Sequence, residues 1–131
     1  GDGTDALIDK LAARGWIHHV TTGADYFSPR HAEPFLARLP SIAATMSDCD
    51  VVLYQAGADP HILDPLGGWL TTEQLQRRDE IVFATLSTVP IAWNFAGGYQ
   101  VEPDGSIPKV IEIHENTARA AIAVLRYHLR Q

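Results

Sequence analysis

Two short apolar runs constrain the fold of this 131-residue chain more than any other feature. Residues 50–55 (DVVLYQ) and 89–95 (VPIAWNF) have the length of β-strands and are almost continuously apolar. Such runs are typical of parallel strands that are buried on both faces. Because a helical stretch separates them, the chain is predicted to be an α/β protein with a short parallel sheet.

Four segments show the spacing of apolar residues that is typical of helices, namely residues 5–13, 31–46, 72–86 and 109–130. Pro40 lies inside the second segment and predicts a kink or a break there. The sequence Thr-Thr-Glu-Gln at 71–74 predicts a capping box at the start of the third. Residues 16–20 read as a further strand. We therefore expect one domain over residues 1–131, with three layers (α/β/α) around the sheet.

Composition excludes several classes of function. Ten Lys and Arg against 16 Asp and Glu give a net charge of −6, which argues against nucleic acid as the main partner. The single cysteine, Cys49, allows no internal disulfide, and its acidic neighbours disfavour the thiolate. No apolar run is long enough to cross a membrane and no signal segment is recognisable, so a cytoplasmic location is expected. Motifs for nucleotide binding or a serine nucleophile are also absent from the sequence.

The residues that follow the two apolar runs are the candidates for chemistry, because α/β proteins place their sites at the carboxyl ends of strands. After the first run, Asp59 and His61 are two residues apart, and in extended backbone they could face one metal ion. After the second run, Gly97 and Gly98 allow a close approach of the backbone to a ligand, and Tyr99 could stabilise an oxyanion. The alternatives are a loop-capping Asp with a surface His, and an ordinary glycine turn with a packed Tyr.

A third candidate is Trp69, which follows two glycines in the segment 64–70 (DPLGGWL). Trp69 could line a groove, or it could pack at the entry to the following helix. The remaining histidines are scattered along the chain: His18, His19, His31, His114 and His128. His18 and His19 are adjacent on the expected strand and point to opposite faces, so at most one of them reaches any given site. His128 lies near a helix carboxyl end, where it complements the helix dipole. His114 is expected on a solvated helix face.

Three segments in this order resemble the C-terminal part of the histone deacetylase superfamily: residues 50–61 (DVVLYQAGADPH), 64–71 (DPLGGWLT) and 90–100 (PIAWNFAGGYQ). The resemblance is closest to bacterial members, including the acetylpolyamine amidohydrolases. The segment 113–119 (IHENTAR) is similar to their final helix. The resemblance covers nearly all of the chain and implies the arginase/deacetylase fold, here in truncated form.

The resemblance also implies roles for individual residues. In that family a zinc ion is held by an Asp-x-His pair and a second Asp, and the second Asp corresponds to Asp59. The transition-state tyrosine corresponds to Tyr99 and its glycine turn to Gly97 and Gly98. His61 and Trp69 would lie at or near the mouth of the substrate channel.

The first four residues resemble those that follow the Asp-x-His pair, which would place the other ligands and the paired catalytic histidines upstream of Gly1. We therefore expect a metal-dependent hydrolase of small amides or esters, with phosphoesters as further substrates. Its site would be rebuilt around Asp59 and His61 with zinc or another divalent ion, and Tyr99 and His61 would be catalytic. A partner subunit could complete it, since we expect a homo-oligomer, most simply a dimer. The alternatives are a conventional zinc deacetylase completed by upstream residues, and a catalytically inactive remnant of the fold.

Overall fold

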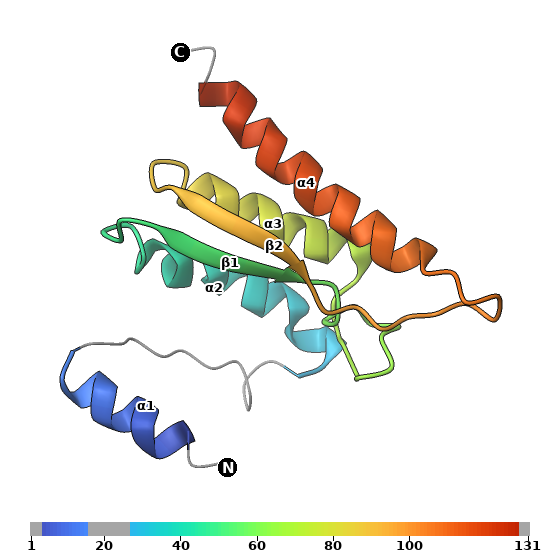
Figure 1. Cartoon of the computed structure of the whole chain (residues 1–131), viewed down its shortest axis with the longest axis horizontal. Coiled ribbons are helices and arrows are strands. Elements are labelled where there is room, and N and C mark those ends of the chain that lie inside the picture. The colour runs from blue at the N-terminus through green and yellow to red at the C-terminus, as the bar shows by residue number, and fades with distance from the viewer. Residues whose placement is uncertain (1–3, 16–26, 129–131) are drawn as a thin grey trace.

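The computed structural model describes residues 4–15 and 27–128. In chain order the elements are α1 (Thr4–Ala13), the 3-10 turn η1 (Pro29–His31), α2 (Ala32–Ala44), β1 (Val52–Gly57), α3 (Thr72–Thr85), β2 (Ile91–Ala96) and α4 (Pro108–His128). Figure 1 shows their arrangement. The α/β class and the four helices agree with the prediction. The strand expected at residues 16–20 lies outside the described residues.

The sheet consists of β1 and β2, which are parallel neighbours. Val52 is opposite Ile91 and Gly57 is opposite Ala96, so the carboxyl ends of the two strands are level. Both strands begin two residues later than the apolar runs predicted. The loops that carry the candidate residues therefore leave from the same edge of the sheet.

One face of the sheet is covered by helices. In Figure 1 the strands pass in front of α2 and α3, while α4 runs beside α3. The Phe83 ring of α3 contacts Tyr54 and Trp93 edge-on, with centroids 5.7 and 5.9 Å apart. Leu53, which points to the other face, is 79% exposed. The prediction that β1 is buried on both faces is therefore wrong within the described part of the chain. Two layers are present there, the sheet and the helices on one face, and the third layer stays an expectation.

Helix α2 runs through Pro40 without a break, which corrects that part of the prediction. Pro40 lies on the exposed side of the helix, whereas Leu36, Leu39 and Ala43 are buried against the sheet. Packing of this buried face keeps the helix continuous despite the hydrogen bond that proline cannot make.

Two apolar clusters form the core. The first joins α2 and α3 to the amino-terminal half of the sheet, around Leu36, Val52 and Leu86. The second lies beneath the loops at the carboxyl edge and consists of Ala32, Ala58, Leu70, Leu75, Val110 and Ile113. This second cluster fixes the loops that carry the candidate residues.

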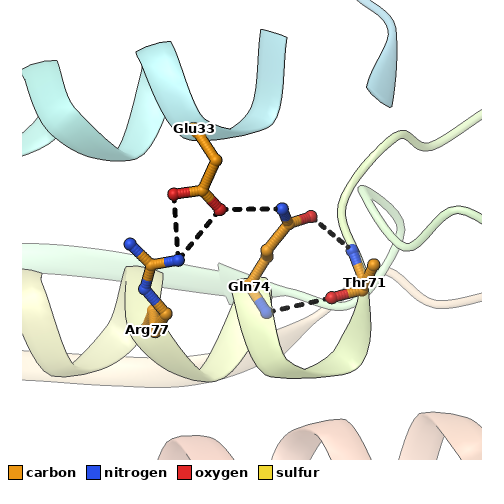
Figure 2. A network of polar contacts seen from close by, with 4 residues as sticks. All are labelled: Glu33, Thr71, Gln74 and Arg77. Atoms are coloured by element: carbon orange, nitrogen blue, oxygen red, sulfur yellow. Dashed lines mark hydrogen bonds and ion pairs between the residues drawn. The ribbon is translucent and has the colours of Figure 1, made fainter. Parts of the chain in front are cut away.

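The start of α3 is held by the predicted capping box. Thr71 Oγ1 accepts the Gln74 N–H at 3.2 Å, and Gln74 Oε1 accepts the Thr71 N–H at 3.0 Å. The Gln74 amide also donates to Glu33 of α2, which forms an exposed ion pair with Arg77 (Figure 2). These contacts set the amino ends of α2 and α3 side by side.

None of the helices in the described ranges has both the length and the apolar character needed to cross a membrane.

Candidate functional site at the carboxyl edge of the sheet

Two loops meet at the carboxyl edge of the sheet. One follows β1 and continues to α3, and the other follows β2 and continues to α4 (Figure 1). The Ala58 N–H donates to the Ala96 carbonyl at 2.9 Å, which holds the first residues of the loops together beyond the strands. The candidate residues Asp59 and Tyr99 therefore share one edge, as expected from the sequence.

The Asp59 carboxyl group lies against the turn that follows β2. A Cβ atom at Gly97 would collide with Asp59 Oδ1, and one at Gly57 would also collide with it. Glycine is therefore required at both positions for this carboxylate to approach the backbone. Asp59 is half-buried and has no hydrogen bond or ion pair to any other residue in the described ranges. Its oxygens are thus available to a ligand.

The His61 side chain does not point to the same place as the Asp59 carboxylate. The His61 N–H donates to the Ala58 carbonyl at 3.1 Å, so residues 58–61 form a turn. The extended backbone from which we predicted that Asp59 and His61 face one ion is therefore wrong, because the turn directs their side chains separately.

The His61 ring is buried, with 3% of the residue exposed, and both ring nitrogens have partners. Nδ1 faces the Gln100 amide at 2.9 Å and the Leu63 N–H at 3.3 Å. Because both groups donate, Nδ1 accepts, and Nε2–H donates to Thr72 Oγ1 at 3.1 Å. Burial lowers the pKa of His61, which favours the neutral ring. To bind a metal, His61 would have to exchange one of these hydrogen bonds for the ion.

The turn after β2 depends on glycine. Gly97 and Gly98 have φ values of +59° and +103°, which L side chains rarely adopt. A Cβ at Gly98 would lie 2.8 Å from Val110 Cγ1 and 2.9 Å from the Ala58 Cβ. The turn is therefore packed between α4 and the first loop, and it reverses the chain directly before Tyr99.

Asp64 connects the two loops. Its carboxylate is buried, with 4% of the residue exposed, and it accepts two backbone hydrogen bonds. The Leu66 N–H donates to Oδ1 at 3.0 Å within the same loop, and the Tyr99 N–H donates to Oδ2 at 2.8 Å from the other loop. Asp64 was noticed in the sequence only as part of the 64–70 segment.

The Tyr99 side chain is 53% exposed and borders an open cleft of about 400 Å³. The cleft is lined by Leu63, Pro65, Tyr99, Gln100, Val101 and Glu102. The Tyr99 hydroxyl has no hydrogen-bond partner in the described part of the chain. It is therefore free to donate to a ligand that enters this cleft.

Beneath the site, a buried polar network supports the end of β1. Arg78 Nη1 donates to the Gly57 carbonyl at 2.8 Å, and Nε donates to Asp79 Oδ1 at 2.8 Å. Asp79 also accepts hydrogen bonds from Tyr54 and from Thr117 of α4. Burial raises the pKa of Tyr54, so its hydroxyl keeps the proton that it donates.

Trp69 and His114 are placed in packing positions. The Trp69 ring meets Phe35 of α2 edge-on, with centroids 5.2 Å apart, and adjoins the second apolar cluster. The solvated position expected for His114 is wrong, because its ring is half-buried over Phe95, with centroids 4.8 Å apart.

The described residues do not form a complete set of metal ligands. In residues 4–15 and 27–128 no group of three His, Cys, Asp or Glu side chains lies close enough to hold an ion. Asp59, with its unpaired carboxylate, fits the role of a single ligand. His18 and His19 lie outside the described residues, as does the side chain of His128.

Reasoning from the sequence did not find Asp64, Gln100 or Arg78. Their partners are 35, 39 and 21 residues away, and local patterns carry no information on such distances. The one available signal was the position of Asp64 in a long loop after a buried strand.

Comparisons with known proteins add no identification: no family, no curated protein and no solved structure matches the chain.

Proposed function

We propose that the carboxyl edge of the sheet is part of the site of a metal-dependent hydrolase that acts on a small amide or ester. One observation carries this proposal. The Asp59 carboxylate is half-buried, unpaired within the described ranges and enclosed by Gly57 and Gly97 next to the turn that leads to Tyr99. Carboxylate oxygens without a protein partner are suitable ligands for a divalent cation.

In this proposal Asp59 is a ligand of zinc or another divalent ion. Such an ion supplies an activated water and polarises the substrate carbonyl when it is bound. Tyr99 donates its hydroxyl hydrogen bond to the oxygen on which negative charge develops. The acyl part of the substrate lies in the cleft beside Tyr99, where Leu63 and Val101 offer apolar surface.

The proposal requires ligands besides Asp59, because catalytic zinc usually has three protein ligands and one open position. The further ligands would come from residues beyond the described ranges or from a second subunit. The resemblance to the deacetylase superfamily supports this division, since it assigns Asp59 and Tyr99 to the site and expects the other ligands on preceding segments.

A second candidate is a non-catalytic domain, and the environment of His61 favours it. The nearest candidate for a second ligand is already bound at both nitrogens by Gln100, Leu63 and Thr72. In that case the buried loop would serve the stability of the fold alone.

The first test compares Asp59→Asn with Asp50→Asn, a matched change at an exposed carboxylate near the opposite end of β1. We expect the protein to bind zinc in titration calorimetry, and Asp59→Asn to lose that binding while Asp50→Asn retains it. Hydrolysis of acetamide, carboxyl-ester and phosphoester model substrates should follow metal content. Equal zinc binding and turnover in Asp59→Asn and the parent would contradict the proposal.

Tyr99→Phe completes the test. It should leave zinc binding unchanged and lower turnover by about 10²-fold or more, since it removes one oxyanion donor. Turnover that is unaffected by this change would exclude the proposed role of the hydroxyl.

A further inference from the structure

Asp64 is the charged group that holds the two loops of the site together. Its carboxylate is almost fully removed from water, and the loss of hydration must be balanced by hydrogen bonds. Two backbone donors supply this balance, Leu66 N–H from its own loop and Tyr99 N–H from the other loop. Hydrogen bonds to an ionised acceptor are stronger than those between neutral groups.

The hydrogen bond to Tyr99 restrains the residue that directly follows the glycine turn. Gly97 and Gly98 have more backbone freedom than any other residue type, so a turn built from them does not by itself fix the residue that follows. The Tyr99 side chain is half exposed and its hydroxyl has no partner among the described residues. Within the described ranges, the hydrogen bond to Asp64 is therefore the polar contact that holds the Tyr99 backbone.

A second hydrogen bond between the two loops lies one residue further along, where the Gln100 amide donates to His61 Nδ1 at 2.9 Å. This hydrogen bond acts through the flexible Gln100 side chain, whereas Asp64 binds the backbone of Tyr99 directly. The direct bond is the one that sets where the Tyr99 Cα lies and hence where its hydroxyl can reach.

We propose that Asp64 is the positioning residue for Tyr99, acting by a hydrogen bond from the Tyr99 backbone to the buried carboxylate. The contribution of Asp64 to catalysis rests on the proposed function, but its placement of the Tyr99 backbone does not.

The test measures amide hydrogen exchange residue by residue, which needs no activity. In the parent protein we expect the Tyr99 amide to be protected, in contrast to the neighbouring Val101 amide, for which the structure gives no acceptor. An unprotected Tyr99 amide in the parent would overturn the proposal.

Asp64→Ala should accelerate exchange at Tyr99 by about tenfold or more, because the acceptor is lost. Exchange of the Ala58 amide, which donates to Ala96 across the sheet edge, should stay unchanged. Asp104→Ala is the matched control, since Asp104 accepts the Ser106 N–H at 2.9 Å in an exposed turn. It should leave Tyr99 as in the parent.

Unchanged exchange at Tyr99 in Asp64→Ala would overturn the proposal. Equal acceleration at Tyr99 and Ala58 would do so as well, because it would mean that Asp64 only stabilises the fold. If Asp64→Ala does not fold, the same comparison is made with Asp64→Leu, which fills a similar space but has no hydrogen-bond acceptor.

Turnover provides a second arm on any substrate that the parent hydrolyses. Asp64→Ala should lower kcat with little change in KM, and it should have no further effect in a Tyr99→Phe background. An equal loss in both backgrounds would contradict positioning through Tyr99. A parent protein without activity would contradict the proposed function. Hydrogen exchange would then still decide whether Asp64 positions Tyr99.

Discussion

At the scale of the residue, His61 shows how burial changes the behaviour of a titratable group. Its ring is enclosed by the loop, Gln100 and Thr72. The charged groups that act on it are Lys109, Glu112, Asp64 and Glu73. Burial, the largest cause, lowers its pKa in the folded state. Protonation would also place a hydrogen on Nδ1, which faces two donors.

This environment predicts a pH dependence of stability. Below the ordinary histidine pKa of about 6.5, the unfolded chain takes up a proton that the folded chain resists, so the free energy of unfolding falls. The contribution of His61 is complete above that pH and is lost as the pH decreases below it. Denaturant unfolding between about pH 7.5 and pH 5 should show a smaller decrease for His61→Gln than for the parent. An identical pH dependence in both proteins would contradict this assignment.

At the scale of the element, α3 connects the core to the site. Its buried residues Val82 and Phe83 pack under the sheet, and Leu75 packs beneath the loops. Its capping residue Thr71 ends the loop that carries Asp59 and Asp64. Leu70 and Leu75 belong to the same apolar cluster, so they staple the loop to the first turn of the helix. The start of α3 therefore also fixes the end of the site loop.

Removal of the cap should destabilise the protein. Thr71→Ala deprives the Gln74 N–H of its acceptor and should lower the free energy of unfolding by about 1 kcal/mol. Thr88→Ala, a change of the same size at an exposed position between α3 and β2, is the control and should have little effect. Equal stability of the two variants in denaturant unfolding would show that the cap does not contribute.

At the scale of the whole molecule, the two-stranded sheet is the unusual feature. Each strand has a neighbour on one side only in the described part of the chain, and open strand edges favour pairing with another chain. On the face away from the helices, Leu53 is 79% exposed, and Val51, just before β1, is 52% exposed. The dimer expected from the sequence stays a prediction, and this face is where we expect its contact.

Sedimentation tests this expectation. The parent should sediment at about twice the mass of one chain at micromolar concentrations, and Leu53→Lys should shift it toward the monomer by placing a charge in the contact. Ile111→Lys introduces the same charge on α4 at a position that is 51% exposed, and it should leave the dimer intact. A monomeric parent, or an equal effect of both changes, would contradict a dimer built on this face.

The sequence by itself determined the α/β class, the two parallel strands and the four helices, because apolar periodicity and capping residues are local signals. It also located Gly97 and Gly98, since a turn with positive φ requires glycine. Only the tertiary structure decided the partners of the side chains. It turned His61 away from Asp59, placed His114 over Phe95 and joined Asp64 to Tyr99 across 35 residues. Spacing along a chain predicts a shared site only while the backbone stays extended, and here a single turn at residues 58–61 separates the side chains of Asp59 and His61.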